Sequence, residues 1–86
     1  MRITTTKRFD KMFIKQTSKT QQEFGKRIDL LLENLYTPIL NTHKLTGKMD
    51  NMWSFNVSGD TRVIFRKSAD DSIMLAAIGS HSELYG

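Results

Sequence analysis

The chain has no cysteine and a single proline among its 86 residues. The lack of cysteine excludes disulfide bonds, a thiolate nucleophile and a zinc–thiolate site, and it suits a reducing cytoplasm. No apolar run reaches signal-peptide length or the roughly 20 residues of a membrane-spanning helix. We therefore expect a soluble cytoplasmic protein with no membrane partner.

Motifs that bind phosphate or metal are also missing. The chain contains no G-x-G-x-x-G, Walker loop or H-E-x-x-H, and His43 and His81 lie far apart without a local carboxylate cluster. We therefore predict neither a metal nor another cofactor. Positive charge is abundant, since 13 Lys and Arg against 9 Asp and Glu give +4. This balance favours a polyanion or an acidic protein as partner, although a solvated lysine face would produce it too.

The N-terminal half predicts a strand followed by two helices of one small domain, residues 1–86, with a single core. The strand covers residues 2–6, where β-branched residues are frequent. In the next segment Phe9, Met12 and Phe13 share one helical face. The opposite side of this helix is cationic: Lys7, Arg8, Lys11 and Lys15.

The second helix is predicted to start at Thr20, because Thr20 and Glu23 have the spacing of a capping box. Pro38 should stop it, with the last turn near Tyr36. Apolar residues recur every three or four positions along it and should pack on the first helix and a sheet. They are Phe24, Ile28, Leu31, Leu32 and Leu35.

The C-terminal half predicts a three-stranded meander. Residues 39–52 read as an ordered loop with a turn at Gly47, and strands follow at 53–57, 61–66 and 73–78. Turns at 58–60 and 68–72 separate the strands. The expected fold is α+β, a small antiparallel β-sheet in the order β-α-α-β-β-β with a two-helix pair packed on one face.

Alternation assigns the side chains of the meander to two faces of the sheet. The apolar set should face the helices: Phe55, Val57, Val63 and Phe65. Trp53 should lie in the core or form a groove wall. Asn56, Arg62 and Arg66 then point to the opposite side, which we call the open face.

Polar residues suited to phosphate chemistry gather on this face or its rim. They are His43, Lys44, Asn56, Asp60, Arg62, Arg66, His81 and Tyr85. Cleavage of RNA by its own 2′-hydroxyl needs a base, an acid and positive charge for the phosphorane, which histidine and arginine supply at neutral pH.

Four of these residues also have a purely structural explanation. His81 can simply end the last strand, and Asp60 is a common turn residue. Tyr85 can pack on the sheet edge. Arg62 can form a surface ion pair with one of three aspartates: Asp60, Asp70 or Asp71.

Two segments resemble a known family: the strand at 60–65 with the acidic turn after it, and the ending at 78–85, IGSHSELY. They are similar to the RelE/ParE superfamily of type II toxin–antitoxin toxins. The branch that they resemble most is the YafQ-like ribonucleases, which typically end in a Gly-Thr-His-Ser-Asp-Leu-Phe-type tail. The resemblance covers nearly the whole chain, including the predicted element order and the segments KRFDK and HKLTG.

The resemblance implies a ribosome-dependent mRNA interferase that enters the ribosomal A site and leaves a 2′,3′-cyclic phosphate. Its partners would be the ribosome, mRNA and an acidic antitoxin whose flexible segment wraps the toxin and covers or distorts the site. His81 matches the tail histidine, the candidate general acid, and His43 the loop histidine, a base or phosphate ligand. Asp60 matches the catalytic aspartate, Arg62 an arginine suited to phosphorane stabilisation, and Tyr85 an aromatic that can stack on a base.

Two positions depart from this branch. Asn56 stands where a histidine is usual, and Thr61 where a tryptophan is usual. Because an amide cannot shuttle a proton near pH 7, the acid–base work would fall to His81, His43 and Asp60, and the identity of the base stays open. The residues expected to bind RNA are Lys44, Lys48, Asn56, Arg66 and Tyr85.

Two other functions fit the same resemblance. A ParE-like toxin would inhibit DNA gyrase through protein contacts, and a non-catalytic module of the same fold would only bind an antitoxin. Gyrase inhibition gives the histidine at position 81 no evident task, so this residue separates the hypotheses.

Overall fold

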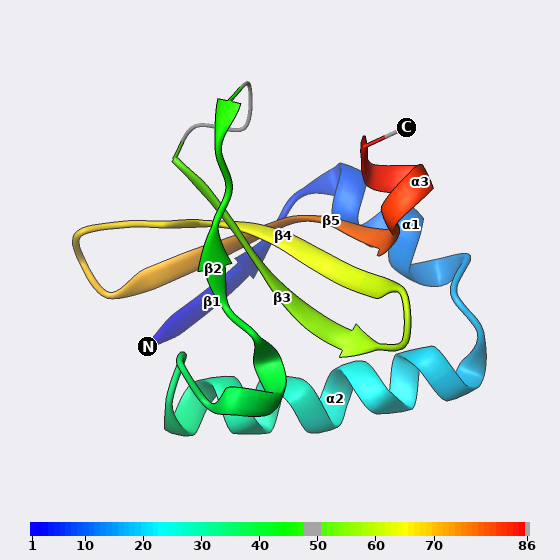
Figure 1. Cartoon of the computed structure of the whole chain (residues 1–86), viewed down its shortest axis with the longest axis horizontal. Helices are drawn as coiled ribbons and strands as arrows, with labels where there is room; N and C mark the ends of the chain where they lie inside the picture. Colours follow the sequence, from blue (N-terminus) through cyan, green and yellow to red (C-terminus); the bar gives the residue numbers. More distant parts are fainter. Residues whose placement is uncertain (48–50, 86) are drawn as a thin grey trace.

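The computed structural model describes residues 1–47 and 51–85 and shows a mixed α+β fold, which confirms the predicted class (Figure 1). Its elements follow the expected order, with short additions in the loop and at the end. They are β1 (Arg2–Thr5), α1 (Lys7–Ile14), α2 (Ser18–Glu33), the 3₁₀ helix η1 (Pro38–Leu40), β2 (His43–Lys44), β3 (Met52–Ser58), β4 (Thr61–Lys67), β5 (Ser72–Ser80) and α3 (His81–Tyr85).

The sheet has five strands in the order β1-β5-β4-β3-β2. Strands β3, β4 and β5 form the predicted antiparallel meander, joined by the two predicted turns. The expectation of a wholly antiparallel sheet is wrong, because β1 runs parallel to β5 and pairs Ile3 with Ile73. These two strands lie at opposite ends of the sequence, so no hairpin dictates their relative direction.

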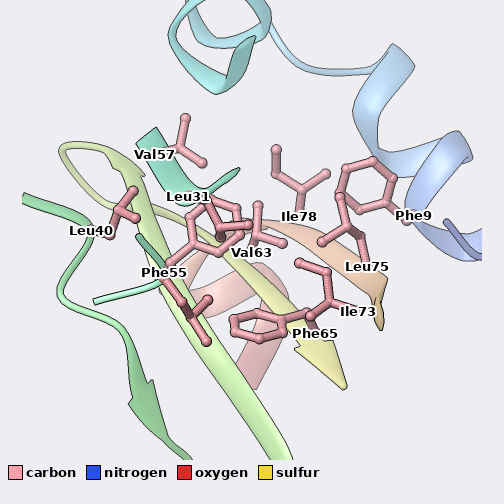
Figure 2. Packing of buried hydrophobic residues seen from close by; sticks show 11 residues of the cluster. Phe9, Leu31, Leu40, Phe55, Val57, Val63, Phe65, Ile73, Leu75 and Ile78 are labelled. Carbon is pink, nitrogen blue, oxygen red and sulfur yellow. The ribbon is translucent and has the colours of Figure 1, made fainter. Parts of the chain in front are cut away.

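The core lies between the sheet and the helices, on the face that the alternation predicted (Figure 2). Phe55, Val57, Val63 and Phe65 are all fully buried there. The rings of Phe55 and Phe65 lie 5.8 Å apart on adjacent strands. Trp53 is partly buried against this cluster, as expected. One buried side chain each from α1 and α2 belongs to the same cluster, so these two helices cover one face of the sheet.

The two helices meet through three phenylalanine rings. Phe24 of α2 lies 5.7 Å from Phe9 and 5.1 Å from Phe13, both on α1. The predicted helix–helix packing is therefore confirmed. No helix in the described ranges has both the length and the apolar character that a membrane crossing requires.

The predicted ends of the second helix are wrong. The helix is capped by Thr17, whose side-chain oxygen accepts the Thr20 N–H at 3.1 Å, so α2 begins at Ser18. Glu23, the predicted capping partner of Thr20, instead lies 3.7 Å from the Arg27 guanidinium. Thr17, three residues before the predicted cap, is therefore the N-cap residue of α2.

Helix α2 ends at Glu33, well before Pro38. Asn34 terminates it, because the Asn34 side-chain oxygen accepts the Tyr36 N–H at 2.9 Å and holds a turn that competes with the helix. Pro38 begins η1 instead. Of the predicted apolar stripe, Leu32 is 48% exposed, because it lies about 100° around the helix from the buried Leu31.

Three short elements were not predicted: η1, β2 and α3. The last two carry residues of the candidate site. The segment expected to be a loop contains β2, in which His43 pairs with Ser54 and Lys44 pairs with Trp53. The polar tail forms α3, whose first residue is His81. Both elements are too short to produce a periodic pattern in the sequence.

Candidate active site

A pocket with a volume of about 340 Å³ lies on the open face of the sheet, within the range of small-molecule sites. Four of the predicted site residues line it, contributed by β2, β4 and α3. The full lining is Asn41, His43, Leu45, Ser54, Arg62, His81 and Tyr85. The structure thus gathers both histidines of the chain and one arginine around a single cavity.

Strand register explains how Arg62 and His81 come together. Arg62 of β4 pairs with Gly79 of β5, and the next pair joins Thr61 to Ser80. His81 follows Ser80 directly, so it lies just past the end of β5, beside the strand that carries Arg62. The predicted placement of a histidine next to a cleft is confirmed.

His43 is oriented by the backbone of the preceding loop. Its Nδ1 lies 2.9 Å from the carbonyl oxygen of Asn41, a residue in the left-handed conformation with φ 47°. Because a carbonyl only accepts hydrogen bonds, Nδ1 carries the proton, and Nε2 of the neutral ring has the lone pair that can accept one. This Nε2 lies 3.5 Å from the hydroxyl of the buried Ser54, at the limit of a hydrogen bond.

Arg62 is held by an amide rather than by a carboxylate. Its Nη1 donates to Oδ1 of Asn56 across the β3–β4 pair at 2.5 Å. The surface ion pair with Asp70 or Asp71, the structural alternative for Arg62, does not form among the described residues, because these carboxylates lie near Arg2 and the N-terminal ammonium, respectively. The guanidinium charge therefore stays available to an anion in the pocket.

His81 and Tyr85 lie four residues apart in α3 and so share one side of the helix. Their ring centroids are 4.8 Å apart, and both rings line the pocket. Asp60, in the β3–β4 turn, is not part of the lining. Its Oδ2 accepts the backbone N–H of His81 at 3.4 Å, so it supports the start of α3. A direct catalytic role of Asp60 stays a prediction.

The residues expected to bind RNA are distributed differently. Asn56 contacts Arg62 but does not line the pocket, whereas Tyr85 lines the pocket and is 38% exposed. Lys44 and Arg66 are exposed but do not line the pocket. Lys48 lies outside the described residues. The RNA-binding roles of all five stay predictions.

Sequence reasoning missed two polar residues of the site, Asn41 and Ser54. Ser54 is fully buried although alternation directs it to the same side as Asn56. A small hydroxyl between Trp53 and Phe55 was the only available signal in the sequence. For Asn41 the signal was the residue type itself, because asparagine adopts the left-handed conformation seen here more readily than most residues.

The centre of the open face is not solvent-exposed. Ile64 and Ala77 pair with each other beside Ser54, and these three residues are between 0% and 2% exposed. Of these three residues, Ser54 lines the pocket, so part of the pocket wall is shielded from water. Within residues 1–47 and 51–85, no three His, Asp or Glu side chains are grouped as metal ligands. The arrangement can bind an anion with Arg62 and move protons with His43 and His81.

Comparison with known proteins is consistent across the whole chain. The model of the YafQ family, bacterial toxins of type II toxin–antitoxin systems, matches residues 1–86. The crystal structure of YafQ from E. coli strain BL21(DE3) superimposes with a TM-score of 0.81 at 22% identity, covering 100% of both chains. YafQ in the E. coli DinJ–YafQ complex gives 0.78 at 18% identity, again covering 100% of both.

A more distant neighbour is the archaeal RelE–RelB complex from Pyrococcus horikoshii OT3. It has a TM-score of 0.72 at 22% identity, with 92% of each chain covered. No curated protein sequence matches the chain significantly. The structural neighbours confirm the predicted RelE-like fold.

Proposed function

The chain belongs to the YafQ family of bacterial type II toxin–antitoxin toxins, and from this premise we propose that it is a ribosome-dependent endoribonuclease. It cleaves mRNA in the ribosomal A site, stops translation in the cytoplasm and is neutralised by a cognate antitoxin. The supporting observation is that His43, Arg62 and His81 converge on one pocket from three separate elements. Two imidazoles beside a guanidinium are the groups that RNA cleavage by internal attack requires.

The first step of the proposed reaction uses His43 as the general base. Its Nδ1 is hydrogen-bonded to the Asn41 carbonyl, so Nε2 is the ring nitrogen with the lone pair to accept the proton of the 2′-hydroxyl. The 2′-oxygen then attacks the adjacent phosphorus, forming an O–P bond and a phosphorane. This geometry favours His43 over Asp60 as the base, because Asp60 does not line the pocket.

The second step uses Arg62 and His81. The Arg62 guanidinium stabilises the negative charge of the phosphorane through charge-assisted hydrogen bonds. His81, in its protonated form, donates a proton to the 5′-oxygen as the P–O5′ bond breaks. The products are a 2′,3′-cyclic phosphate and a free 5′-hydroxyl. Tyr85, beside the His81 ring, stacks on a base of the bound codon.

Partner binding follows from charge. The net charge of +4 favours ribosomal RNA, mRNA and an acidic antitoxin. Lys44 and Arg66 are exposed outside the pocket, where they can contact phosphates of the neighbouring nucleotides. An antitoxin is supported by the E. coli neighbour, which forms a DinJ–YafQ complex.

The test is cleavage of a defined mRNA on programmed ribosomes by the wild-type protein and His81→Ala. We expect the variant to lose at least 100-fold in single-turnover rate, because general acid catalysis contributes about 10²–10⁴-fold. Asp29→Asn is the matched control, since Asp29 is exposed on α2 away from the pocket and should leave the rate unchanged.

Two outcomes would reject the proposal. Undiminished cleavage by His81→Ala would remove the assigned acid. Absence of cleavage by the wild-type protein, together with inhibition of DNA supercoiling by gyrase, would favour the ParE-like alternative. Absence of both activities with retained antitoxin binding would favour a non-catalytic module.

A further inference from the structure

Helix α3 holds two pocket residues, His81 and Tyr85, yet it is only five residues long and contains no buried residue. An isolated helix of this length is unstable in water, because nucleation is costly and few hydrogen bonds follow it. Specific contacts at its N-terminus must therefore keep both rings in the pocket.

Ser80 and Glu83 supply these contacts as a reciprocal capping box. The backbone N–H of Ser80 donates to Oε1 of Glu83 at 2.8 Å, and the backbone N–H of Glu83 donates to the Ser80 hydroxyl at 3.2 Å. His81 lies between these two bonds, in the first position of the helix. The box thus holds the backbone of the residue assigned as the general acid.

Gly79 makes room for the Glu83 side chain. A Cβ atom at Gly79 would lie 3.0 Å from Oε1 of Glu83, 3.2 Å from its Cβ and 3.3 Å from its Cδ. Gly79 is buried and has an ordinary φ, so the reason for glycine here is space and not backbone conformation. The side chain that caps α3 therefore lies against the strand that ends at His81.

We propose that Glu83 is a positioning residue for His81 that acts through the Ser80–Glu83 capping box over Gly79. The carboxylate does not line the pocket and needs only to accept a hydrogen bond. Its kinetic consequence rests on the ribonuclease function proposed above, whereas its structural consequence does not.

The kinetic experiment compares Glu83→Ala with Glu83→Gln on programmed ribosomes. Glutamine keeps an acceptor oxygen at the same position and loses the charge, so Glu83→Gln should stay within about threefold of the wild-type kcat. Glu83→Ala should lose about tenfold in kcat with KM unchanged, which corresponds to about 1.4 kcal/mol, within the range for loss of a helix cap. An equal loss in both variants would overturn the proposal, because it would indicate that the charge itself is used.

Gly79→Ala tests the close approach directly. The added methyl group should displace the Glu83 side chain and lower kcat as Glu83→Ala does. In the double variant with Glu83→Ala the methyl group no longer meets Oε1 or Cδ, and only the Cβ of residue 83 stays within 3.2 Å, so Gly79→Ala should cost less rate there than it does alone. Additive losses would show that the two residues act separately and would contradict the capping arrangement.

The structural experiment is independent of catalysis. Amide hydrogen exchange of Ser80 should be slow in the wild type and in Glu83→Gln, and it should be faster in Glu83→Ala while the amides of β4 stay unchanged. Unchanged Ser80 exchange in Glu83→Ala would overturn the proposal. If the wild-type protein cleaved no RNA but Ser80 exchanged as expected, the proposed function would fail and the positioning of His81 would stand.

Discussion

Substitutions of Asn56 can distinguish two requirements of catalysis: the orientation of the Arg62 side chain and the charge that it carries. Asn56 Oδ1 accepts the hydrogen bond of Arg62 Nη1, and both side chains are half-buried. Hydrogen bonds to charged groups contribute about 1.5–3 kcal/mol. Because water can replace the amide at this half-exposed position, we expect Asn56→Ala to cost about 1 kcal/mol of transition-state stabilisation. This cost corresponds to a roughly fivefold slower cleavage step.

Arg62→Ala should cost far more, since it removes the group that faces the phosphorane. Loss of one such electrostatic contact typically costs about 2.7–4 kcal/mol, or 10²–10³-fold in rate. Ribosome binding should fall less than turnover, because the pocket contact strengthens as charge develops on the phosphate.

Asn56→Asp completes the series. Aspartate keeps an acceptor oxygen for Arg62 but adds a negative charge, which attracts the guanidinium and repels the phosphate. The expected order of single-turnover rates on programmed ribosomes is therefore wild type, Asn56→Ala, Asn56→Asp and Arg62→Ala, from fastest to slowest.

Two results would refute this assignment of roles. Equal losses in Asn56→Ala and Arg62→Ala would mean that Asn56 contacts the substrate itself. A faster reaction in Asn56→Asp would mean that position 56 supplies a base, as the histidine usual in the YafQ-like branch could. Far-ultraviolet circular dichroism of each variant controls for folding.

Three further predictions concern stability and the base. Thr17→Ala should lower the free energy of unfolding by about 1 kcal/mol in urea titrations, whereas Glu23→Ala should cost less than 0.5 kcal/mol, because Thr17 caps α2. Phe65→Ala should cost about 3–5 kcal/mol, seen as a lower denaturation midpoint, since its ring is fully buried. Ser54→Ala should leave stability within about 1 kcal/mol and slow cleavage a few-fold, because the hydroxyl faces Nε2 of His43; an unchanged rate would show that Ser54 does not assist His43.

The meander was predictable because its strands alternate cleanly. Phe55 and Val63 fall on the core side and Asn56 and Arg62 on the other, and a register shift between Asn56 and Ser58 brings each pair opposite one another. The ends of α2 were less predictable, since several threonines and an asparagine compete for cap positions. Which one caps depends on where the chain must turn to pack against α1.

The candidate site was only partly predictable. His81 and Arg62 could be placed near each other, because both follow from the order and register of the long strands β4 and β5. The contact of Ser54 with His43 could not, since it requires β2, a two-residue strand that pairs at the sheet edge. Ser80 and Glu83 have the spacing of a capping box, but the sequence did not show that the Glu83 side chain would lie against Gly79.

The sequence by itself determined the α+β class, the two faces of the sheet and the identity of the groups that can do phosphate chemistry. These properties depend on local periodicity and on side-chain type, which are written residue by residue. Only the tertiary structure decided which nitrogen of His43 can accept a proton, that Asn56 rather than an aspartate holds Arg62, and how α3 is anchored. The residues in each of these contacts are two to six positions apart, but the contact geometry depends on the turns and strand pairing of the folded chain.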